Sequence, residues 1–242
     1  MAKKIVISLI VVILLLAGGF VLYGMNAMEA VGVEDSLASD DTVEVSKIDE
    51  GWLFDGSGTD TAYVFYPGAR VEAEAYAPLM HRLASQGIDC FLLEMPINFA
   101  ILDTDAAEEI IEEYDYDSWY IGGHSMGGAA AAMFAADDTE EIEAEGVEGL
   151  ILLAAYESED MSDADMRTLV IYGSEDGVLN MEKLAEGRSL VPADGYEEVC
   201  IEGGNHAQFG SYGEQSGDGE AKISADEQLA QTTEAILRFA AT

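Results

Sequence analysis

The sequence predicts an α/β protein in which a mostly parallel central sheet carries helices on both faces. Short apolar runs alternate along the chain with longer amphipathic stretches, as in strands that are joined by helices. The apolar runs are nearly continuous, which is typical of strands buried on both faces. We expect six such strands, at residues 61–66, 89–94, 119–122, 149–155, 168–172 and 198–202.

Helical patterns fill the intervals between these strands and close the chain. We expect helices near residues 73–86, 104–114, 126–136, 181–191 and 224–240. Residues 42–54 are expected to add one or two strands at the edge of the sheet. An internal repeat of about 20 to 50 residues is absent from the sequence, which excludes solenoids and propellers.

The amino-terminal region has the composition of a membrane segment. Lys3 and Lys4 precede an apolar run over residues 5–23 in which Ser8 is the only polar residue. This length suits a bilayer-spanning helix and exceeds the apolar region of about 7 to 15 residues in a cleavable signal peptide. We therefore predict that residues 1–28 form an uncleaved transmembrane anchor.

The alternative is a signal peptide cleaved near Ala27 or Ala30, which would give a secreted protein. Because positive residues stay on the cytoplasmic side, the lysine pair predicts a single-pass protein of the cell membrane with the rest of the chain outside the cytoplasm. Residues 29–41 are expected to form an acidic linker, and residues 42–242 a single folded domain.

The chain is strongly acidic, with 48 Asp and Glu residues, 10 Lys and Arg residues and a formal net charge of -38. This charge argues against nucleic acid and anionic lipid as partners, because phosphate binding requires Lys and Arg. The acidic residues are scattered and form no calcium-loop motif, so we interpret them as a solvated shell and expect neither a metal nor a cofactor. Cys90 and Cys200 lie in apolar runs and are expected to be buried free thiols.

Ser125 is the strongest candidate for a reactive residue. It lies in Gly123-His124-Ser125-Met126-Gly127, between a predicted strand and a predicted helix. Small residues two positions before and after the serine allow a strained turn that projects the hydroxyl above the sheet, the nucleophile elbow. The alternative is a glycine-rich turn that holds an ordinary serine.

A serine nucleophile needs a base that takes its proton. Of the three histidines, His81 falls within a predicted helix, and the side chain of His124 is expected to point away from Ser125. His206 lies in a loop directly after the last predicted strand. We therefore predict that His206 is the base.

The base in turn needs an acid that fixes its tautomer. Asp176 follows a predicted strand at the carboxyl edge of the sheet, where reactive groups of open α/β sheets gather. Glu175 is the competing candidate. The chain order Ser125, Asp176, His206 is the order of the α/β-hydrolase triad.

Acyl transfer also requires donors to the oxyanion. We predict the backbone N–H groups of Met126 and of Ala69, which lies in the loop after the first core strand. Arg70 follows Ala69 and is expected either to face the substrate or to form a structural salt bridge with a neighbour such as Glu72 or Glu74.

The sequence resembles small bacterial α/β-hydrolases of the dienelactone-hydrolase-like group over residues 61–239. The resemblance rests on four motifs: Phe-Tyr-Pro-Gly at 65–68, Gly-Gly-His-Ser-Met-Gly-Gly at 122–128, Tyr-Gly-Ser-Glu-Asp-Gly at 172–177 and Gly-Gly-Asn-His-Ala-Gln-Phe-Gly at 203–210. It implies an α/β-hydrolase fold in which strand 61–66 lies between strand 89–94 and the strand before Ser125. This order separates Cys90 from Cys200 and argues against a disulfide.

Two features depart from relatives of this group. Dienelactone hydrolases use a cysteine nucleophile, whereas this sequence has Ser125. Many relatives insert a helical cap at the position of residues 156–167, where this chain is too short for a large cap domain. The loops at 96–103 and 207–219 are then expected to wall an open pocket that takes small or surface-presented acyl groups.

The sequence therefore predicts a serine hydrolase that cleaves a small-molecule carboxylic ester through an acyl-enzyme on Ser125. A peptidase or a thioesterase would use the same triad. A noncatalytic exported module that binds a cell-surface ligand is the alternative from a different class. The membrane is expected as a partner through the amino-terminal segment only.

Overall fold

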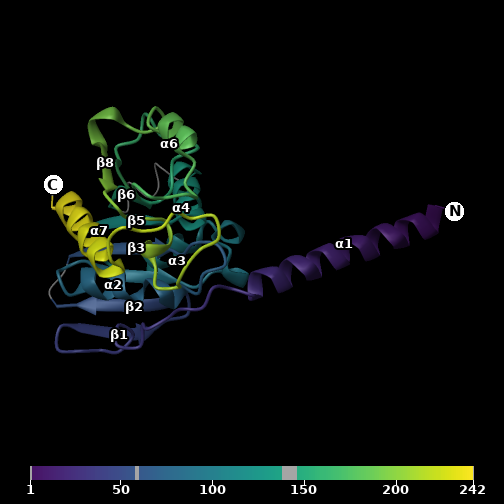
Figure 1. The fold of residues 1–242 in the computed structure, drawn as a ribbon, viewed down its shortest axis with the longest axis horizontal. Coiled ribbons are helices and arrows are strands. Elements are labelled where there is room, and N and C mark those ends of the chain that lie inside the picture. Colours follow the sequence, from purple (N-terminus) through teal and green to yellow (C-terminus); the bar gives the residue numbers. More distant parts are fainter. Residues whose placement is uncertain (1, 58–59, 138–145, 242) are drawn as a thin grey trace.

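An eight-stranded sheet forms the centre of the computed structural model, which describes residues 2–57, 60–137 and 146–241. The strands lie in the order β1-β2-β4-β3-β5-β6-β7-β8 (Figure 1). Their bounds are β1 Val43–Lys47, β2 Gly51–Gly56, β3 Thr61–Tyr66, β4 Asp89–Leu93, β5 Ser118–His124, β6 Val147–Leu153, β7 Arg167–Gly173 and β8 Tyr196–Ile201. Strands β3 to β8 are parallel, whereas β2 pairs antiparallel with both β1 and β4.

All six predicted core strands are present, and β3 has the predicted bounds. The weakly patterned residues 42–54 contribute the β1–β2 hairpin at the edge. Strand β3 lies between β4 and β5, the order that the resemblance implies. The predicted α/β-hydrolase fold is confirmed.

Helices cover both faces of the sheet. The α-helices are α1 Ala2–Met25, α2 Ala77–Ala84, α3 Ala106–Glu113, α4 Met126–Asp137, α6 Met181–Gly187 and α7 Ala225–Ala240. Short 3-10 turns are η1 Ala73–Tyr76, η2 Pro96–Asn98, η3 Ala100–Leu102, η4 Ala193–Gly195 and η5 Ala207–Phe209. The predicted helix at 73–86 thus begins as η1, and the one at 181–191 ends at residue 187.

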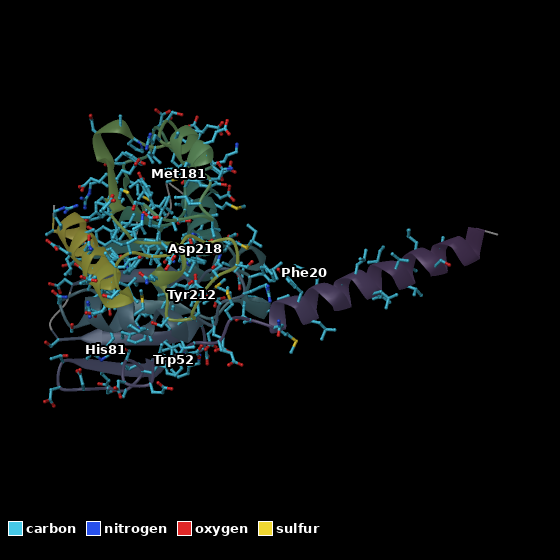
Figure 2. All side chains as sticks on the ribbon, viewed as in Figure 1. Phe20, Trp52, His81, Met181, Tyr212 and Asp218 are labelled. Atoms are coloured by element: carbon cyan, nitrogen blue, oxygen red, sulfur yellow. The ribbon has the colours of Figure 1, made fainter. Side chains whose placement is uncertain are left out.

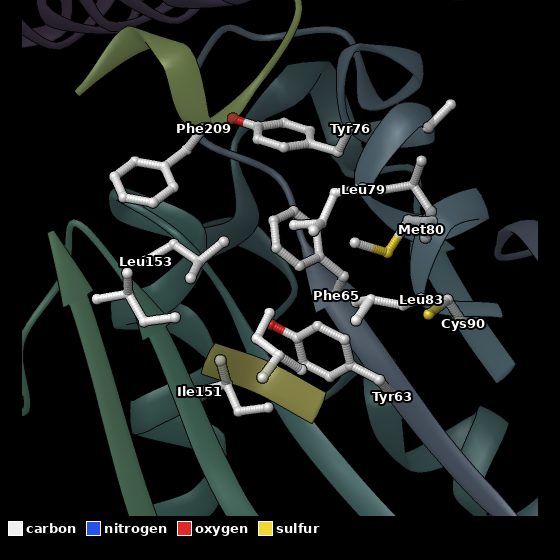
Figure 3. Packing of buried hydrophobic residues seen from close by; sticks show 14 of the residues in the cluster. Tyr63, Phe65, Tyr76, Leu79, Met80, Leu83, Cys90, Ile151, Leu153 and Phe209 are labelled. Carbon is white, nitrogen blue, oxygen red and sulfur yellow. The ribbon is translucent and has the colours of Figure 1, made fainter. Parts of the chain in front are cut away.

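Two apolar clusters, one on each face, explain why the core strands lack alternation between apolar and polar residues. Successive strand residues point to opposite faces, so Tyr63 and Phe65 of β3 join one cluster and Val64 joins the other. Figure 3 shows Phe65 packed beside Leu79 and Met80 of α2. Helices α3 and α4 cover the opposite face. Burial on both faces supplies the hydrophobic stabilisation that positions the strand ends.

The cysteines are separated by four strands of the sheet and are not paired with each other. Cys90 in β4 is buried, as predicted, whereas the prediction of burial is wrong for Cys200. Cys200 lies on the edge strand β8, where its neighbours Val199 and Ile201 pack towards α7 and leave it on the other face. An edge strand lacks a neighbouring strand on one side, so an outward side chain there stays accessible.

The predicted linker lies against the folded domain. Met28 forms a parallel bridge with Val71, and the N–H of Val31 donates to the carbonyl of Ser211 over 2.7 Å. Val33 is buried. Residues of the predicted linker, before residue 42, therefore pack against the domain that was predicted to begin there.

Glu157, in the loop after β6, supplies a testable pH dependence. Its Oε1 accepts hydrogen bonds from the N–H groups of Ser158 and Glu159, while Oε2 is buried without a hydrogen-bond partner among the described residues. Burial raises the pKa of Glu157 from 4.5 to about 7. Because the folded protein holds this proton to a higher pH than the unfolded chain does, its stability falls as pH rises from 4.5 to about 7.

We expect Glu157→Gln to remove this loss. The difference in free energy of unfolding, variant minus wild type, should therefore be larger at pH 8 than at pH 4.5. We expect an increase of about 3 kcal/mol, since each pKa unit corresponds to about 1.4 kcal/mol. Urea unfolding at both pH values measures this change. Glu159→Gln, at an exposed neighbour, is the matched control and should show no such rise. Parallel pH curves for wild type and Glu157→Gln would contradict the expectation.

Candidate active site

Ser125 occupies a strained turn between β5 and α4. Its φ angle is 53°, in the left-handed region that residues with a side chain rarely adopt. The N–H of Ser125 donates to the carbonyl of Leu153 in β6 over 2.9 Å, which fixes the turn to the sheet. The side chain is partly exposed at the carboxyl edge of the parallel strands. A strained turn of this shape between a strand and a helix is the backbone geometry expected of a nucleophile elbow.

The glycines of the motif are required by close backbone contacts. A Cβ at Gly123 would lie 2.3 Å from the carbonyl oxygen of Tyr66, and one at Gly127 would lie 2.1 Å from the same atom. Both distances are far below van der Waals contact, so no side chain fits at either position. The first turn of α4 can therefore approach the end of β3 only with glycine at these two positions.

The structure brings His206 and Asp176 together from two loops at the same edge of the sheet. Nδ1 of His206 lies 2.9 Å from Oδ2 of Asp176, and both side chains are 1% exposed. Oδ1 of Asp176 accepts hydrogen bonds of 2.8 Å from the N–H groups of Val178 and Leu179. Since an ionised carboxylate only accepts, Nδ1 of His206 donates.

The second ring nitrogen of His206 is then the one available to a substrate or nucleophile. In the neutral ring, a proton on Nδ1 leaves a lone pair on Nε2. Nε2 of His206 is buried and has no hydrogen-bond partner within the described part of the chain. Such a nitrogen is suited to accept a proton. Glu175, the competing acid, instead bonds Nζ of Lys222 through Oε1 over 2.6 Å.

His124, the residue before Ser125, lies against His206, with 4.5 Å between the ring centroids. The hydroxyl of Tyr76 accepts the N–H of Gly68 and forms a hydrogen bond of 2.8 Å with Nδ1 of His124. Burial, reinforced by His206, holds the pKa of His124 well below its usual range. A neutral His124 therefore links the loop after β3 to the elbow, a contact that the sequence analysis did not foresee.

Asp218 is a site residue that the sequence analysis missed. Its Oδ1 accepts hydrogen bonds from the N–H groups of His206, Gly177 and Gly219 over 3.2, 3.1 and 2.8 Å, and its Oδ2 accepts the N–H of Ala207 over 2.8 Å. Figure 2 shows Asp218 on the segment between β8 and α7. One carboxylate thus joins the loop of Asp176 to the loop of His206. The sequence around Asp218 has no feature that distinguishes this residue among the 48 acidic residues of the chain.

The two N–H groups predicted as oxyanion donors, those of Ala69 and Met126, have no hydrogen-bond partner among the described residues. In the loop after β3, the N–H of Gly68 donates to Tyr76 and that of Arg70 donates to the carbonyl of Asn98. Ala69 lies between them, and its N–H has no partner in the described residues. The same is true of Met126 at the first turn of α4. Both residues are partly exposed.

Arg70 has partners that neither sequence expectation included. Its Nε donates to the carbonyl of Tyr23 over 3.0 Å and its Nη2 to that of Asn26 over 2.6 Å. The guanidinium also lies 3.9 Å from the centre of the Tyr23 ring. Arg70 therefore caps the carboxyl end of α1, where terminal carbonyls lack helical partners. Oε2 of Glu72 instead accepts the N–H of Ala30.

The loop between β6 and β7 contains no helix at residues 154–166, which agrees with the absence of a large cap at this position. The predicted wall at 96–103 contains η2 and η3, and η3 packs against α4. The other predicted wall, 207–219, contains η5 and Asp218. No group of three or more His, Cys, Asp or Glu side chains suited to hold a metal occurs in the described residues.

Comparison with known proteins agrees with the observed fold. The model of the alpha/beta hydrolase family matches residues 62–230. A CIB-like hydrolase from Thermoplasma acidophilum is 18% identical with a TM-score of 0.56, and a dienelactone hydrolase from Anabaena variabilis is 14% identical with a TM-score of 0.60. Each alignment covers 81% of this chain and 98% of the solved structure. No curated protein matches the sequence. On the match to its family model, the chain belongs to the alpha/beta hydrolase family.

Proposed function

We propose that the protein is a serine hydrolase that cleaves carboxylic esters through an acyl-enzyme on Ser125. The observation that carries this proposal is the buried hydrogen bond of 2.9 Å between His206 and Asp176, with the ring of His206 against that of His124, the residue before Ser125. A histidine held in this tautomer can act first as a base and then as an acid.

The reaction begins when Nε2 of His206 takes the proton of the Ser125 hydroxyl and Oγ attacks the ester carbonyl. The negative charge that develops on the carbonyl oxygen is stabilised by the N–H groups of Met126 and Ala69. His206, now protonated and stabilised by Asp176, gives its proton to the departing alcohol. Water, activated by His206 in the same way, then releases the carboxylic acid and restores Ser125.

The open site favours small acyl groups or acyl groups presented at a surface. Ser125 and Met126 are partly exposed, and the β6–β7 loop supplies no helical lid. Dienelactone hydrolases use a cysteine nucleophile, so the serine at this position argues against a dienelactone substrate. We therefore expect the activity on short esters to equal or exceed the activity on dispersed triglyceride.

The helix α1 is proposed to be an uncleaved anchor that leaves the hydrolase domain outside the cytoplasm. Residues Ser8–Met25 are long and apolar enough to cross a membrane, and the helix projects from the domain in Figure 1. Its carboxyl end is bound by Arg70 of the domain. Cleavage near Ala27 would remove both carbonyls to which Arg70 donates, which favours retention over release.

A fluorophosphonate probe tests the proposed chemistry, because it reacts with a serine only where a base activates the hydroxyl. We expect the full-length protein to carry the adduct on Ser125, located by peptide mass spectrometry. His206→Ala should slow labelling by about 10³-fold or more. His81→Ala is the matched control and should label at the wild-type rate. An adduct elsewhere, or labelling of His206→Ala at the wild-type rate, would overturn the mechanism.

A further inference from the structure

The carboxyl end of α1 is packed onto the loop of η2 and η3, which follows β4. The ring of Phe99 stacks on Phe20 and Tyr23 at centroid distances of 5.0 and 6.4 Å. Nδ2 of Asn98 donates to the carbonyl of Gly24 over 3.2 Å. Figure 2 shows Phe20 where α1 meets the domain. Together with the bonds from Arg70, these contacts fix the orientation of the domain relative to the helix.

The same loop borders the candidate active site. The carbonyl of Asn98 accepts the N–H of Arg70, the residue after the proposed oxyanion donor Ala69. Turn η3 packs against α4, whose first residue is Met126. The loops after β3, β4 and β5 all leave the carboxyl edge of the parallel strands. Helix α1 therefore contacts the domain at the same edge of the sheet that carries Ser125.

The length of α1 places this loop at the surface of a bilayer. An 18-residue apolar segment, Ser8–Met25, rises about 27 Å at about 1.5 Å per residue, close to the hydrocarbon thickness of about 30 Å. Tyr23 then lies near the membrane interface, where aromatic residues are enriched, and Phe20 lies about 4.5 Å deeper at about 1.5 Å per residue. Phe99, stacked on Phe20, lies at the same depth.

Two apolar side chains that follow Phe99 closely in the sequence are exposed at the surface of the protein. Ile101 is 41% exposed and Leu102 is 49% exposed, both in η3. Apolar side chains next to a membrane-spanning helix gain hydrophobic free energy when they enter the interface. The net charge of -38 favours a bilayer surface of zwitterionic or uncharged lipid over an anionic one.

We propose that η3 inserts into the bilayer that holds α1, so that the active site opens onto the membrane surface and acts on acyl esters carried by that bilayer. This inference rests on the proposed serine hydrolase function and names its substrate class. An ester group of a membrane amphiphile lies at the headgroup level, the depth at which the α1 contacts hold the loop. The substrate would reach Ser125 without leaving the membrane surface.

Insertion of η3 is tested on the full-length chain in phosphatidylcholine vesicles. In a Cys200→Ser background, an environment-sensitive dye is attached at Ile101→Cys or, as matched control, at the exposed Gln86→Cys. Gln86 follows α2 and precedes β4, at the opposite edge of the sheet. Cys90 is buried and stays unlabelled. We expect nitroxide-labelled lipid to quench the dye at position 101 but not at position 86. Equal quenching at both positions, or release of the chain by alkaline carbonate, would overturn the proposal.

The substrate class is tested with Ile101→Asp/Leu102→Asp, which replaces the two exposed apolar side chains of η3. Because η3 also belongs to the predicted wall of the pocket, the readout is the ratio of two rates: hydrolysis of 4-methylumbelliferyl oleate held in phosphatidylcholine vesicles to hydrolysis of dissolved 4-methylumbelliferyl butyrate. This ratio should fall by about tenfold relative to wild type. The matched control is Gln86→Asp, which should change neither rate.

The two assays separate this inference from the proposed function. Equal losses on both esters would show that η3 does not act through the membrane and would overturn the inference. Wild-type hydrolysis of butyrate without hydrolysis of the vesicle-held oleate would overturn it too, while the serine hydrolase mechanism stands. Absence of fluorophosphonate labelling at Ser125 would instead remove the function on which the inference rests.

Discussion

Asp176→Asn is expected to lower kcat for ester hydrolysis by about 10⁴-fold with little change in the fold. Oδ1 of Asp176 accepts two backbone N–H groups, so the amide oxygen of asparagine would take this place. The NH₂ group would then face Nδ1 of His206. Because an amide NH₂ only donates, Nδ1 would have to accept, and the ring proton would move to Nε2. A protonated Nε2 in the neutral ring cannot take the proton of Ser125.

The control for this change is Glu175→Gln, the adjacent acid on the same loop. Glu175 pairs with Lys222 at the surface, and a surface pair contributes little. Its kcat should stay within about twofold of wild type. The measurement is kcat on a short soluble ester, together with circular dichroism to verify the fold. Comparable losses for both variants would contradict the assignment of Asp176 as the partner of His206.

Asp218→Ala is expected to destabilise the protein by about 3 kcal/mol and to lower kcat by about 10- to 100-fold. Four backbone N–H groups, among them those of His206 and Ala207, donate to this carboxylate. Each buried N–H that loses its acceptor costs about 1 to 3 kcal/mol, partly recovered where water enters. The loop of His206 would then be free to shift relative to Asp176, and small misplacements of a catalytic group reduce the rate strongly.

The matched control is Glu220→Ala, an exposed acid two residues away in the same segment. It should change the stability by no more than about 0.5 kcal/mol. Urea unfolding measures the stability, and the ratio of kcat to KM on a short ester separates positioning from binding. We expect the Asp218 variant to lose kcat with KM nearly unchanged. A loss of stability without a loss of kcat would limit Asp218 to a structural role.

Much of the fold could be predicted from the sequence because its signals are local. Continuous apolar runs mark strands buried on both faces, and the position of β3 was predicted to the residue. The turn at Ser125 is marked by Gly123 and Gly127, whose missing side chains are required by the close contact with the end of β3. The order of serine, acid and histidine motifs is likewise a property of the chain itself.

Tertiary structure decided the features that depend on which distant segments meet. Glu175 and Asp176 are adjacent in the sequence, yet only Asp176 is bonded to His206. Arg70 binds the end of α1, some 44 to 47 residues earlier in the chain, and Asp218 bridges two loops. By itself, the sequence determined the strands and the three candidates for reactive residues, Ser125, Asp176 and His206. The folded chain decided their partners, because hydrogen bonds between distant loops leave no periodic pattern among so many similar acidic residues.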